Sequence, residues 1–476
     1  KVLAELVLDE AFEAEGRVDL EIGDPASFSA YVQQNHVDNN LAVLIEAYGS
    51  SYDGFKRVHP SDRGPIDTEA ELENIGARLA VELKRSNGRW LFEGSGYSEE
   101  RGNGLPEAEN STDAWDLSAQ RRFEFADWAA TALAYGQYRE FENTFSATDA
   151  DRTSDRVVLD QFSVPAWSAG GAFTLAGTLS ENSEFFGGLD TRWIEGETNE
   201  RFFNDGTIFR RQREGGGEQI LFGAFAGWWW TWDNFDIEVS GRLDYWQLYN
   251  GRLIVEDLTG GPAGSREDFA DRDDLEPSAQ IAFGWEPHQD WRFELAAAQN
   301  FRLPTINELY RPFRIGNDTT LANAELDPER FLSLRTSANY SPEESHLRFS
   351  ATITYYSIKD AGANVTLDPD PSGALAQRLN VPDAEVFGVE LGADYMLSEA
   401  LALSLRYAYS QAQFDSSTGG VDIDGNDFPL APENRVTGSL SYTRGNWLAE
   451  LQGRYESKSF DDTNNNREIP SAFTLD

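Results

Sequence analysis

WRFELAAAQNFR (Trp291–Arg302), LPTINELYRPFRIGNDTTLANAELDPE (303–329) and RFLSLRTSANY (330–340) follow one another and together decide the fold. In the first and third segments apolar and polar residues alternate, which is typical of a β-strand with one apolar face. The middle segment has no such period and is rich in turn-forming residues. A short polar turn containing Pro342 follows, and the next alternating run begins almost at once. This hairpin therefore has a long loop at one end and a short turn at the other.

The same asymmetry recurs along the chain. Runs that we expect to be strands of about 10–15 residues are joined alternately by short polar turns and by long segments rich in Asp, Glu, Asn, Gly and Pro. The short turns are 36–40, 85–89, 122–127, 178–183, 232–235, 286–290, 341–345, 397–400 and 443–446. The long segments are 50–74, 98–112, 138–155, 197–216, 250–274, 303–328, 359–383 and 414–433. Short turns at one end and long loops at the other are typical of outer-membrane barrels.

Composition excludes several classes of protein. The 476 residues contain no cysteine, so disulfide frameworks, thiolate metal sites and cysteine nucleophiles are excluded. No apolar run approaches the roughly 18 residues of a membrane-spanning helix. With 82 acidic against 39 basic residues, the net charge of −43 argues against nucleic acid as a partner. No catalytic motif is present, so we expect no enzyme activity.

Alternation predicts which side chains share a face, and tryptophan indicates which face meets lipid. Nine tryptophans lie within a few residues of the short turns: Trp90, Trp128, Trp228, Trp229, Trp230, Trp232, Trp285, Trp291 and Trp447. Such belts mark membrane–water boundaries, whereas the alternative, the core of a large soluble sheet, would not gather them at strand ends. We therefore expect the apolar face to meet lipid, with Leu403, Leu405, Phe349 and Ile353 outward and Arg406, Arg348 and Glu390 in the lumen.

Counting the runs predicts the size of the barrel. The first run is 2–12, and SAFTLD (471–476) starts a further strand, so about 19–20 strands are present. An open sheet edge would leave backbone groups unpaired in lipid, so we expect further strands beyond residue 476. The prediction is an all-β fold: a transmembrane antiparallel β-barrel of the 22-strand type, with long outer loops and short periplasmic turns.

Two motifs resemble the signatures of TonB-dependent outer-membrane receptors. The family's R-x-P-T-x-x-E-L run and its N-P-x-L-x-P-E run match residues on either side of the long loop, except that Ala324 replaces the usual proline. VFGVELGADY (386–395) is similar to a second family signature. The matching residues are Arg302, Pro304, Thr305, Glu308, Leu309, Asn323, Leu326, Pro328, Glu329, Gly388 and Glu390.

The resemblance implies an active transport receptor in the outer membrane of a Gram-negative bacterium. Residues 1–476 would then be one incomplete transmembrane β-barrel domain, without the family's N-terminal plug and its last strands. The implied partners are outer-membrane lipid, a TonB-type energising protein acting through the plug, and a small metal-chelate cargo, with the receptor as a monomer. A ferric siderophore is the favoured cargo; cobalamin, another metal chelate or an oligosaccharide is the alternative. A passive porin or a structural surface barrel is the alternative from a different class.

Two candidate sites lie in the expected outer loops. Family analogy allows cargo contact by Glu308, Tyr310, Arg311, Arg314 and Asn317, although we favour the interpretation that these groups brace a folded loop. DIDGND supplies Asp422, Asp424 and Asp427 as hard oxygen ligands around a glycine turn, as in a calcium loop, but the bidentate glutamate is missing. A solvated hairpin tip is the favoured alternative there. Glu390 is expected to pair with an arginine of the plug or of a neighbouring strand, such as Arg406.

Overall fold

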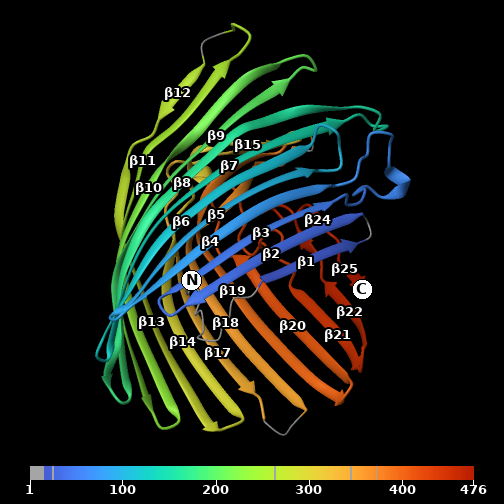
Figure 1. Ribbon diagram of the computed structural model, residues 1–476. Helices are drawn as coiled ribbons and strands as arrows, with labels where there is room; N and C mark the ends of the chain where they lie inside the picture. The colour runs from blue at the N-terminus through green and yellow to red at the C-terminus, as the bar shows by residue number, and fades with distance from the viewer. Residues whose placement is uncertain (1–15, 24–25, 262–263, 343–345, 371) are drawn as a thin grey trace. The chain divides into compact units, whose positions relative to one another are not determined.

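The computed structural model describes residues 16–23, 26–261, 264–342, 346–370 and 372–476, and it is almost entirely β-structure (Figure 1). One sheet has 23 strands and a second has two, and the helical elements are the short 3-10 helix η1 (Pro60–Asp62) and α1 (Ile306–Tyr310). The strands are β1 (Gly16–Gly23), β2 (Ser27–Asp38), β3 (Leu41–Tyr52), β4 (Leu72–Arg85), β5 (Gly88–Gly102), β6 (Glu109–Phe125), β7 (Trp128–Thr148), β8 (Asp155–Ser180), β9 (Ser183–Asn204), β10 (Phe209–Trp232), β11 (Phe235–Asp257), β12 (Ser265–Asp268), β13 (Arg272–His288), β14 (Trp291–Arg302), β15 (Phe313–Ile315), β16 (Asp318–Leu321), β17 (Glu329–Tyr340), β18 (Leu347–Asp368), β19 (Leu375–Ser398), β20 (Leu401–Phe414), β21 (Asn434–Arg444), β22 (Trp447–Glu456), β23 (Ser459–Phe460), β24 (Glu468–Ile469) and β25 (Ala472–Leu475).

The predicted hairpin pattern is confirmed. Long strands that follow one another in sequence pair antiparallel, and eight of the nine predicted short turns join such strands. The ninth, 341–345, includes residues outside the described part of the chain. Setting aside β12, β15 and β16, which lie within long loops, leaves 20 strands in the described part of the large sheet, in agreement with the predicted 19–20; the last of them, β25, has four residues. The run 2–12 that was predicted as the first strand lies outside the described residues, and β1 is the first strand that the structure describes.

The predicted strand length is wrong for seven strands. β7 to β11, β18 and β19 have 21 to 26 residues instead of about 10–15, and only 205–208 of the predicted loop 197–216 is free of strand. The extensions are polar, so no apolar alternation reveals them, yet the backbone ladder continues because charged side chains pair across strands. Arg252 of β11, for example, forms ion pairs with Glu197 of β9 and Glu214 of β10.

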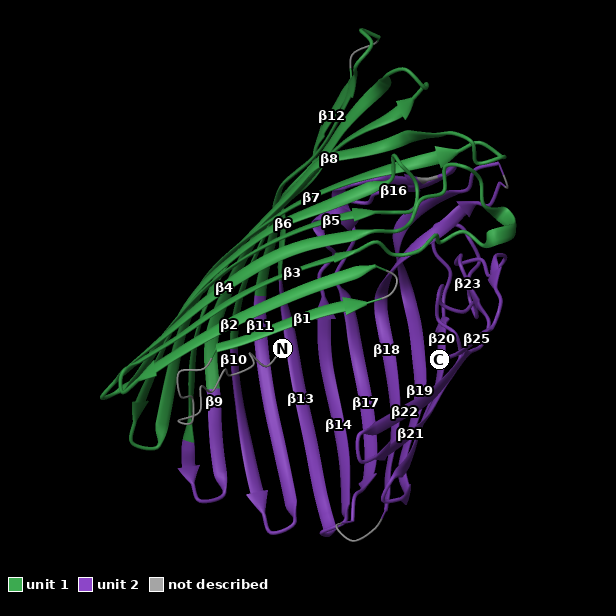
Figure 2. Cartoon of the chain, turned by 45° about the vertical axis from the view of Figure 1, so that its right-hand side comes forward, with its two compact units in different colours: residues 1–177, 187–224, 245–274 green, residues 178–186, 225–244, 275–476 purple. Residues whose placement is uncertain are grey.

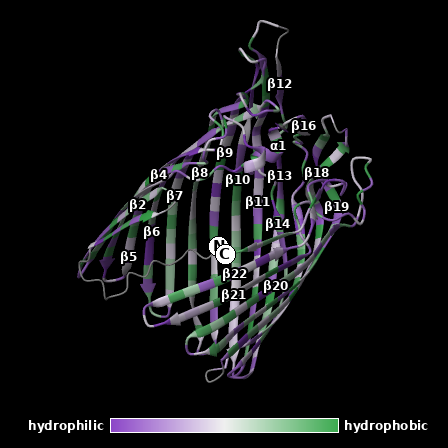
Figure 3. Ribbon diagram, turned by 90° about the vertical axis from the view of Figure 1, so that its right-hand side faces the viewer, coloured by the Kyte–Doolittle hydropathy of each residue, from purple (hydrophilic) through white to green (hydrophobic). Residues whose placement is uncertain are grey.

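The register of the ladders confirms which of the predicted side chains share a face. Leu405 lies opposite Ala393, which lies opposite Phe349, whereas Arg406 lies opposite Gly392. Leu405 and Ile353 are each 46% exposed, and their position on the lipid side stays a prediction. Figure 3 shows the same alternation of hydrophobic and hydrophilic residues along neighbouring strands.

The chain divides into two compact units, and the strands β8, β9, β10 and β11 each contribute residues to both (Figure 2). Unit 1 comprises residues 1–177, 187–224 and 245–274, and unit 2 comprises 178–186, 225–244 and 275–476. In unit 2 an apolar core lies near the long loops and is built from Ile358, Ala361, Val365, Val381, Ala384, Phe414 and Ile423.

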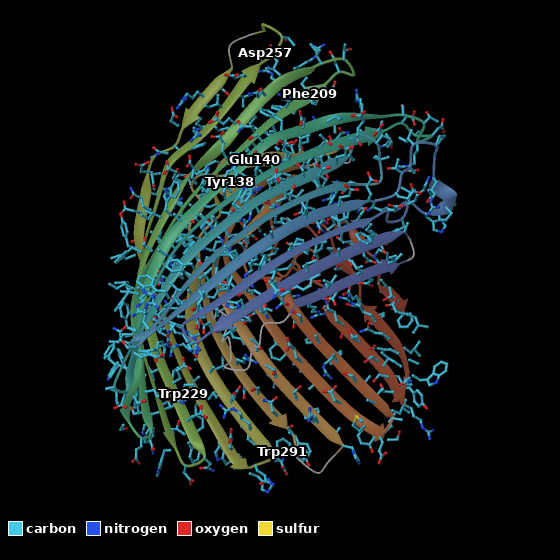
Figure 4. The ribbon with its side chains drawn as sticks, viewed as in Figure 1. Tyr138, Glu140, Phe209, Trp229, Asp257 and Trp291 are labelled. Atoms are coloured by element: carbon cyan, nitrogen blue, oxygen red, sulfur yellow. The ribbon has the colours of Figure 1, made fainter. Side chains whose placement is uncertain are left out.

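Aromatic side chains form the predicted belt at the short-turn ends. In unit 2 the ring centre of Trp285 lies 6.1 Å from that of Phe235 and 5.6 Å from that of Phe293. The ring centres of Phe293 and Trp291 are 5.5 Å apart. Trp229 and Trp291 both lie near the short turns in Figure 4.

Unit 1 adds a second aromatic level that the sequence analysis missed. Trp115 lies opposite Tyr138, which lies opposite Trp167, and the Tyr138 and Trp167 rings are 4.4 Å apart. Trp128, at the short-turn end of β7, is about ten residues from Tyr138, which corresponds to roughly 33 Å of strand. For a strand tilted by about 45° this matches the roughly 25 Å apolar band between the two girdles of an outer-membrane barrel.

Candidate functional site: the loop after β14

A short capped helix starts the long loop between β14 and β17. Thr305 is the N-cap of α1: its hydroxyl accepts from the Glu308 N–H at 3.2 Å, and the Glu308 carboxylate accepts from the Thr305 N–H at 2.7 Å. This reciprocal pair is a capping box, which stabilises a helix too short to persist alone. Leu309 and Tyr310 are buried beneath it, at 0% and 2% exposure.

The two halves of the motif meet in an ion-pair cluster, which we name the clasp (Arg302, Glu308 and Glu329). Arg302 and Glu329 lie opposite each other where β14 and β17 end, and their side chains form an ion pair. The Arg302 guanidinium also contacts the Glu308 carboxylate at 3.0 Å. Burial raises the pKa of Glu308, but the Arg302 hydrogen bond and the helix cap outweigh this, so the pKa lies below its usual value. The clasp thus closes the loop at its base with charged groups.

A glycine of β18 completes the clasp. The N–H of Gly362 donates to Glu329 at 2.6 Å. A Cβ at this position would lie only 3.3 Å from both Glu329 and Arg302, so a side chain would crowd the ion pair.

Arg378 of β19 holds the carbonyl end of α1. Its Nη1 donates to the carbonyl oxygens of Asn307 at 2.6 Å and Arg311 at 2.7 Å, and its guanidinium carbon lies 5.1 Å from the Phe313 ring centre. Burial lowers the pKa of Arg378 to about 10. A cation at a helix C-terminus satisfies carbonyl groups that the helix cannot bond itself.

A small polar cavity of about 240 Å³ lies beside the clasp. Its lining residues are Arg302, Pro304, Glu308, Leu326, Asp327, Glu329, Gly362, Ala363, Asn364, Arg378 and Asn380. Pockets for drug-sized ligands usually have about 300–1,000 Å³, so this cavity suits ordered water better than a metal chelate.

The structure places the five predicted cargo residues in contacts within the loop. Glu308 belongs to the clasp, Tyr310 is buried, and the Arg311 carbonyl accepts from Arg378. Arg314 donates to the Gly316 carbonyl at 2.8 Å and to the Asn317 side chain at 2.9 Å. These contacts support the interpretation that the five residues brace the loop, and their contact with cargo stays a prediction.

The remaining motif residues are placed as follows. The side chain of Asn323 accepts from the Glu325 N–H at 3.0 Å, Leu326 is 4% exposed, and Pro328 is buried. Gly388 and Glu390 lie in β19. Arg406, one expected partner of Glu390, is wrong, because it pairs with Asp394 at 2.8 Å instead; an arginine of the plug stays a prediction. Both carboxylates lie two positions from Gly392, which faces Arg406, so the sequence could not distinguish them.

In the candidate calcium segment, exposed aspartates alternate with a buried isoleucine, which the sequence analysis missed. Ile423, between Asp422 and Asp424, has 0% exposure and belongs to the apolar core, so its neighbours point outward. The Ser417 hydroxyl donates to Asp422 at 2.8 Å, and the Gln413 amide donates to Asp427 at 3.0 Å. Within the described residues, no group of three or more His, Cys, Asp or Glu side chains is arranged to hold a metal ion. Calcium binding stays a prediction.

Loops of unit 2 also bind one another. Thr463, 1% exposed, accepts from the Thr366 N–H at 3.1 Å, and Arg467 forms an ion pair with Asp318 at 2.7 Å. These contacts join residues about 100 or more positions apart in the sequence, and no sequence motif predicts them.

Unit 1 has its own loop anchor. Arg152 contacts the Asp67 carboxylate through two nitrogen atoms, and its carbonyl accepts from the Ile66 N–H at 3.3 Å. The Arg152 hydrogen bond lowers the pKa of Asp67 to about 2. The loop 53–71 is thereby tied to the turn 149–154.

Fold and site together define an outer-membrane receptor barrel. A family model for TonB dependent receptor-like beta-barrels matches residues 48–476, so the chain belongs to the TonB-dependent receptor family. Members are transporters of the Gram-negative outer membrane, not enzymes. No helix in the described part of the chain is long and apolar enough to cross a membrane.

Solved structures share this fold at low sequence identity. The ferric yersiniabactin uptake receptor FyuA from Yersinia pestis is 15% identical with a TM-score of 0.73, covering 98% of this chain and 72% of its own. The copper transporter OprC is 16% identical with a TM-score of 0.77, and the match covers 97% of this chain and 71% of OprC. The ferric-catecholate import receptor Fiu from E. coli K12 is 10% identical with a TM-score of 0.71, and the match covers 97% of this chain and 74% of Fiu. No curated protein matches this sequence.

Proposed function

We propose that this receptor binds a ferric siderophore outside the cell and imports it with energy from the TonB system. Family membership supports transport, and receptors for iron chelates are among the proteins that share the fold. The observation that carries the proposal is the fixed arrangement of the unit 2 loops by an apolar core and by ion pairs. A rigid outer surface loses little entropy on binding, which tight capture of a scarce solute requires.

Charge narrows the class of chelate. The segment 415–433 contains five carboxylate residues and no Lys or Arg, and the whole chain carries a net charge of −43. Such a surface repels an anionic tris-catecholate complex and attracts neutral or cationic complexes, for example ferric hydroxamates. The proposed cargo is therefore a neutral or cationic ferric chelate.

Growth and uptake by a deletion strain test this function. The strain should fail to grow on one ferric hydroxamate as its sole iron source, and restoring the gene should restore uptake only when TonB is active. Normal growth on every iron chelate, or a defect confined to cobalamin, would contradict the proposal. Uptake that continues without TonB would favour the passive porin instead.

A further inference from the structure

Basic residues gather at two adjacent short turns of unit 1. Although acidic residues outnumber basic ones by 82 to 39, the ends of β4, β5 and β6 carry five cations within a stretch of two turns. They are Lys84, Arg85, Arg89, Arg121 and Arg122.

The strand register separates these cations between the two faces. Leu83 lies opposite Trp90, which lies opposite Arg121, so Arg121 lies on the face that carries Leu117 and the other exposed apolar side chains. Arg85, opposite Gly88, shares that face one step nearer the turn. Lys84, Arg89 and Arg122 lie opposite one another on the polar face.

Arg121 is held between two aromatic rings at the membrane boundary. Its guanidinium carbon lies 5.3 Å from the Trp90 ring centre and 4.7 Å from that of Phe123. Nη2 donates to the side chain of Asn87 at 2.8 Å. The residue is only 6% exposed, and its Nη1 has no hydrogen-bond partner within the described residues. A buried, charged N–H without an acceptor is unfavourable, so an acceptor from outside the protein is expected there.

We propose that Arg121, Arg85 and Trp90 bind the headgroup of an anionic phospholipid in the leaflet at the short-turn ends. The phosphate oxygens would accept from Nη1 of Arg121, which has no hydrogen-bond partner among the described residues, and Arg85 adds a second positive charge. Trp90 and Phe123 are 39% and 36% exposed, so a rotation of the rings opens Nη1 to lipid.

Lipid binding to the full-length receptor in nanodiscs tests the site. Native mass spectrometry should find a phosphatidylglycerol molecule that the wild type retains and that Arg121→Gln binds on the order of fivefold more weakly, the effect of one arginine at a membrane surface. Arg122→Gln is the matched control, because it removes the same charge from the next residue on the opposite face. Equal losses in the two variants, or none in Arg121→Gln, would overturn the proposal.

Two further measurements are needed: one for the case in which Arg121→Gln does not fold, and one that distinguishes a lipid phosphate from free phosphate. If Arg121→Gln does not fold, as judged by its heat-dependent mobility on gels, Asn87→Ala replaces it. That change frees Nη2 and should maintain or increase lipid affinity, and a decrease would contradict the site. Millimolar inorganic phosphate should leave the lipid bound, whereas displacement would assign the site to free phosphate.

Discussion

The outer loops of the two units are fastened in different ways. In unit 1 the loop 53–71 is tied to its neighbour by the Asp67–Arg152 ion pair, whereas in unit 2 the loop 415–433 inserts Ile423 into an apolar core. Apolar burial contributes about 1.5–3 kcal/mol per large side chain and depends little on pH or salt. An ion pair is sensitive to both. Similar loops should therefore respond differently to mutation and to acid.

The largest effect should come from removing the apolar anchor. Ile423→Ala should destabilise the loop 415–433 by about 2–4 kcal/mol, because the 0% exposed side chain leaves a cavity among Val365, Val381 and Phe414. Hydrogen exchange of backbone amides should show the loss in residues 415–433, while residues 53–71 remain protected.

Asp424→Ala is the control for this change, since Asp424 is the exposed neighbour of Ile423. With a calcium chelator present it should leave exchange in the loop unchanged. If Ile423→Ala and Asp424→Ala raised exchange equally, the apolar core would not be what holds this loop.

The clasp is an ionic cluster in which Glu329 is largely buried, and its loss should have an intermediate effect. Glu329→Gln keeps an acceptor for the Gly362 N–H but removes the charge that meets Arg302, which should cost about 1 kcal/mol because Arg302 is partly exposed and keeps Glu308. Faster amide exchange in α1 is the measurement, and the exposed Glu325→Gln is the control. Unchanged exchange in α1 would show that the helix cap and Arg378 hold the loop without the clasp.

The difference between the two loop systems also explains what the sequence could predict. Turns, strand count and faces follow from local patterns, such as the alternation around Leu405 and the tryptophans beside the turns, so they were predicted. Contacts between distant residues have no local signal: Ile423 meets Val365 and Val381, and Arg378 reaches α1 from β19. The motif resemblance located Arg302, Glu308 and Glu329, but only the structure shows that they form one cluster.

The smallest and most condition-dependent effect should appear at Asp67. Its pKa is about 2 in the folded protein against an ordinary 3.8, so the ion pair contributes stability that is complete above about pH 4 and is lost as the pH falls through about 2. Asp67→Asn should reproduce the acid state at pH 7 and speed proteolysis within 53–71 on the order of two- to fivefold, as expected for a single ion pair near the surface. Asp62→Asn in the same loop is the control, because Asp62 is exposed and, in the part of the chain that the structure describes, accepts a side-chain hydrogen bond from Ser61 and no other side chain. Cleavage of 415–433 should not change with pH over this range. If acid released both loops together, the contrast between ionic and apolar fastening would be wrong.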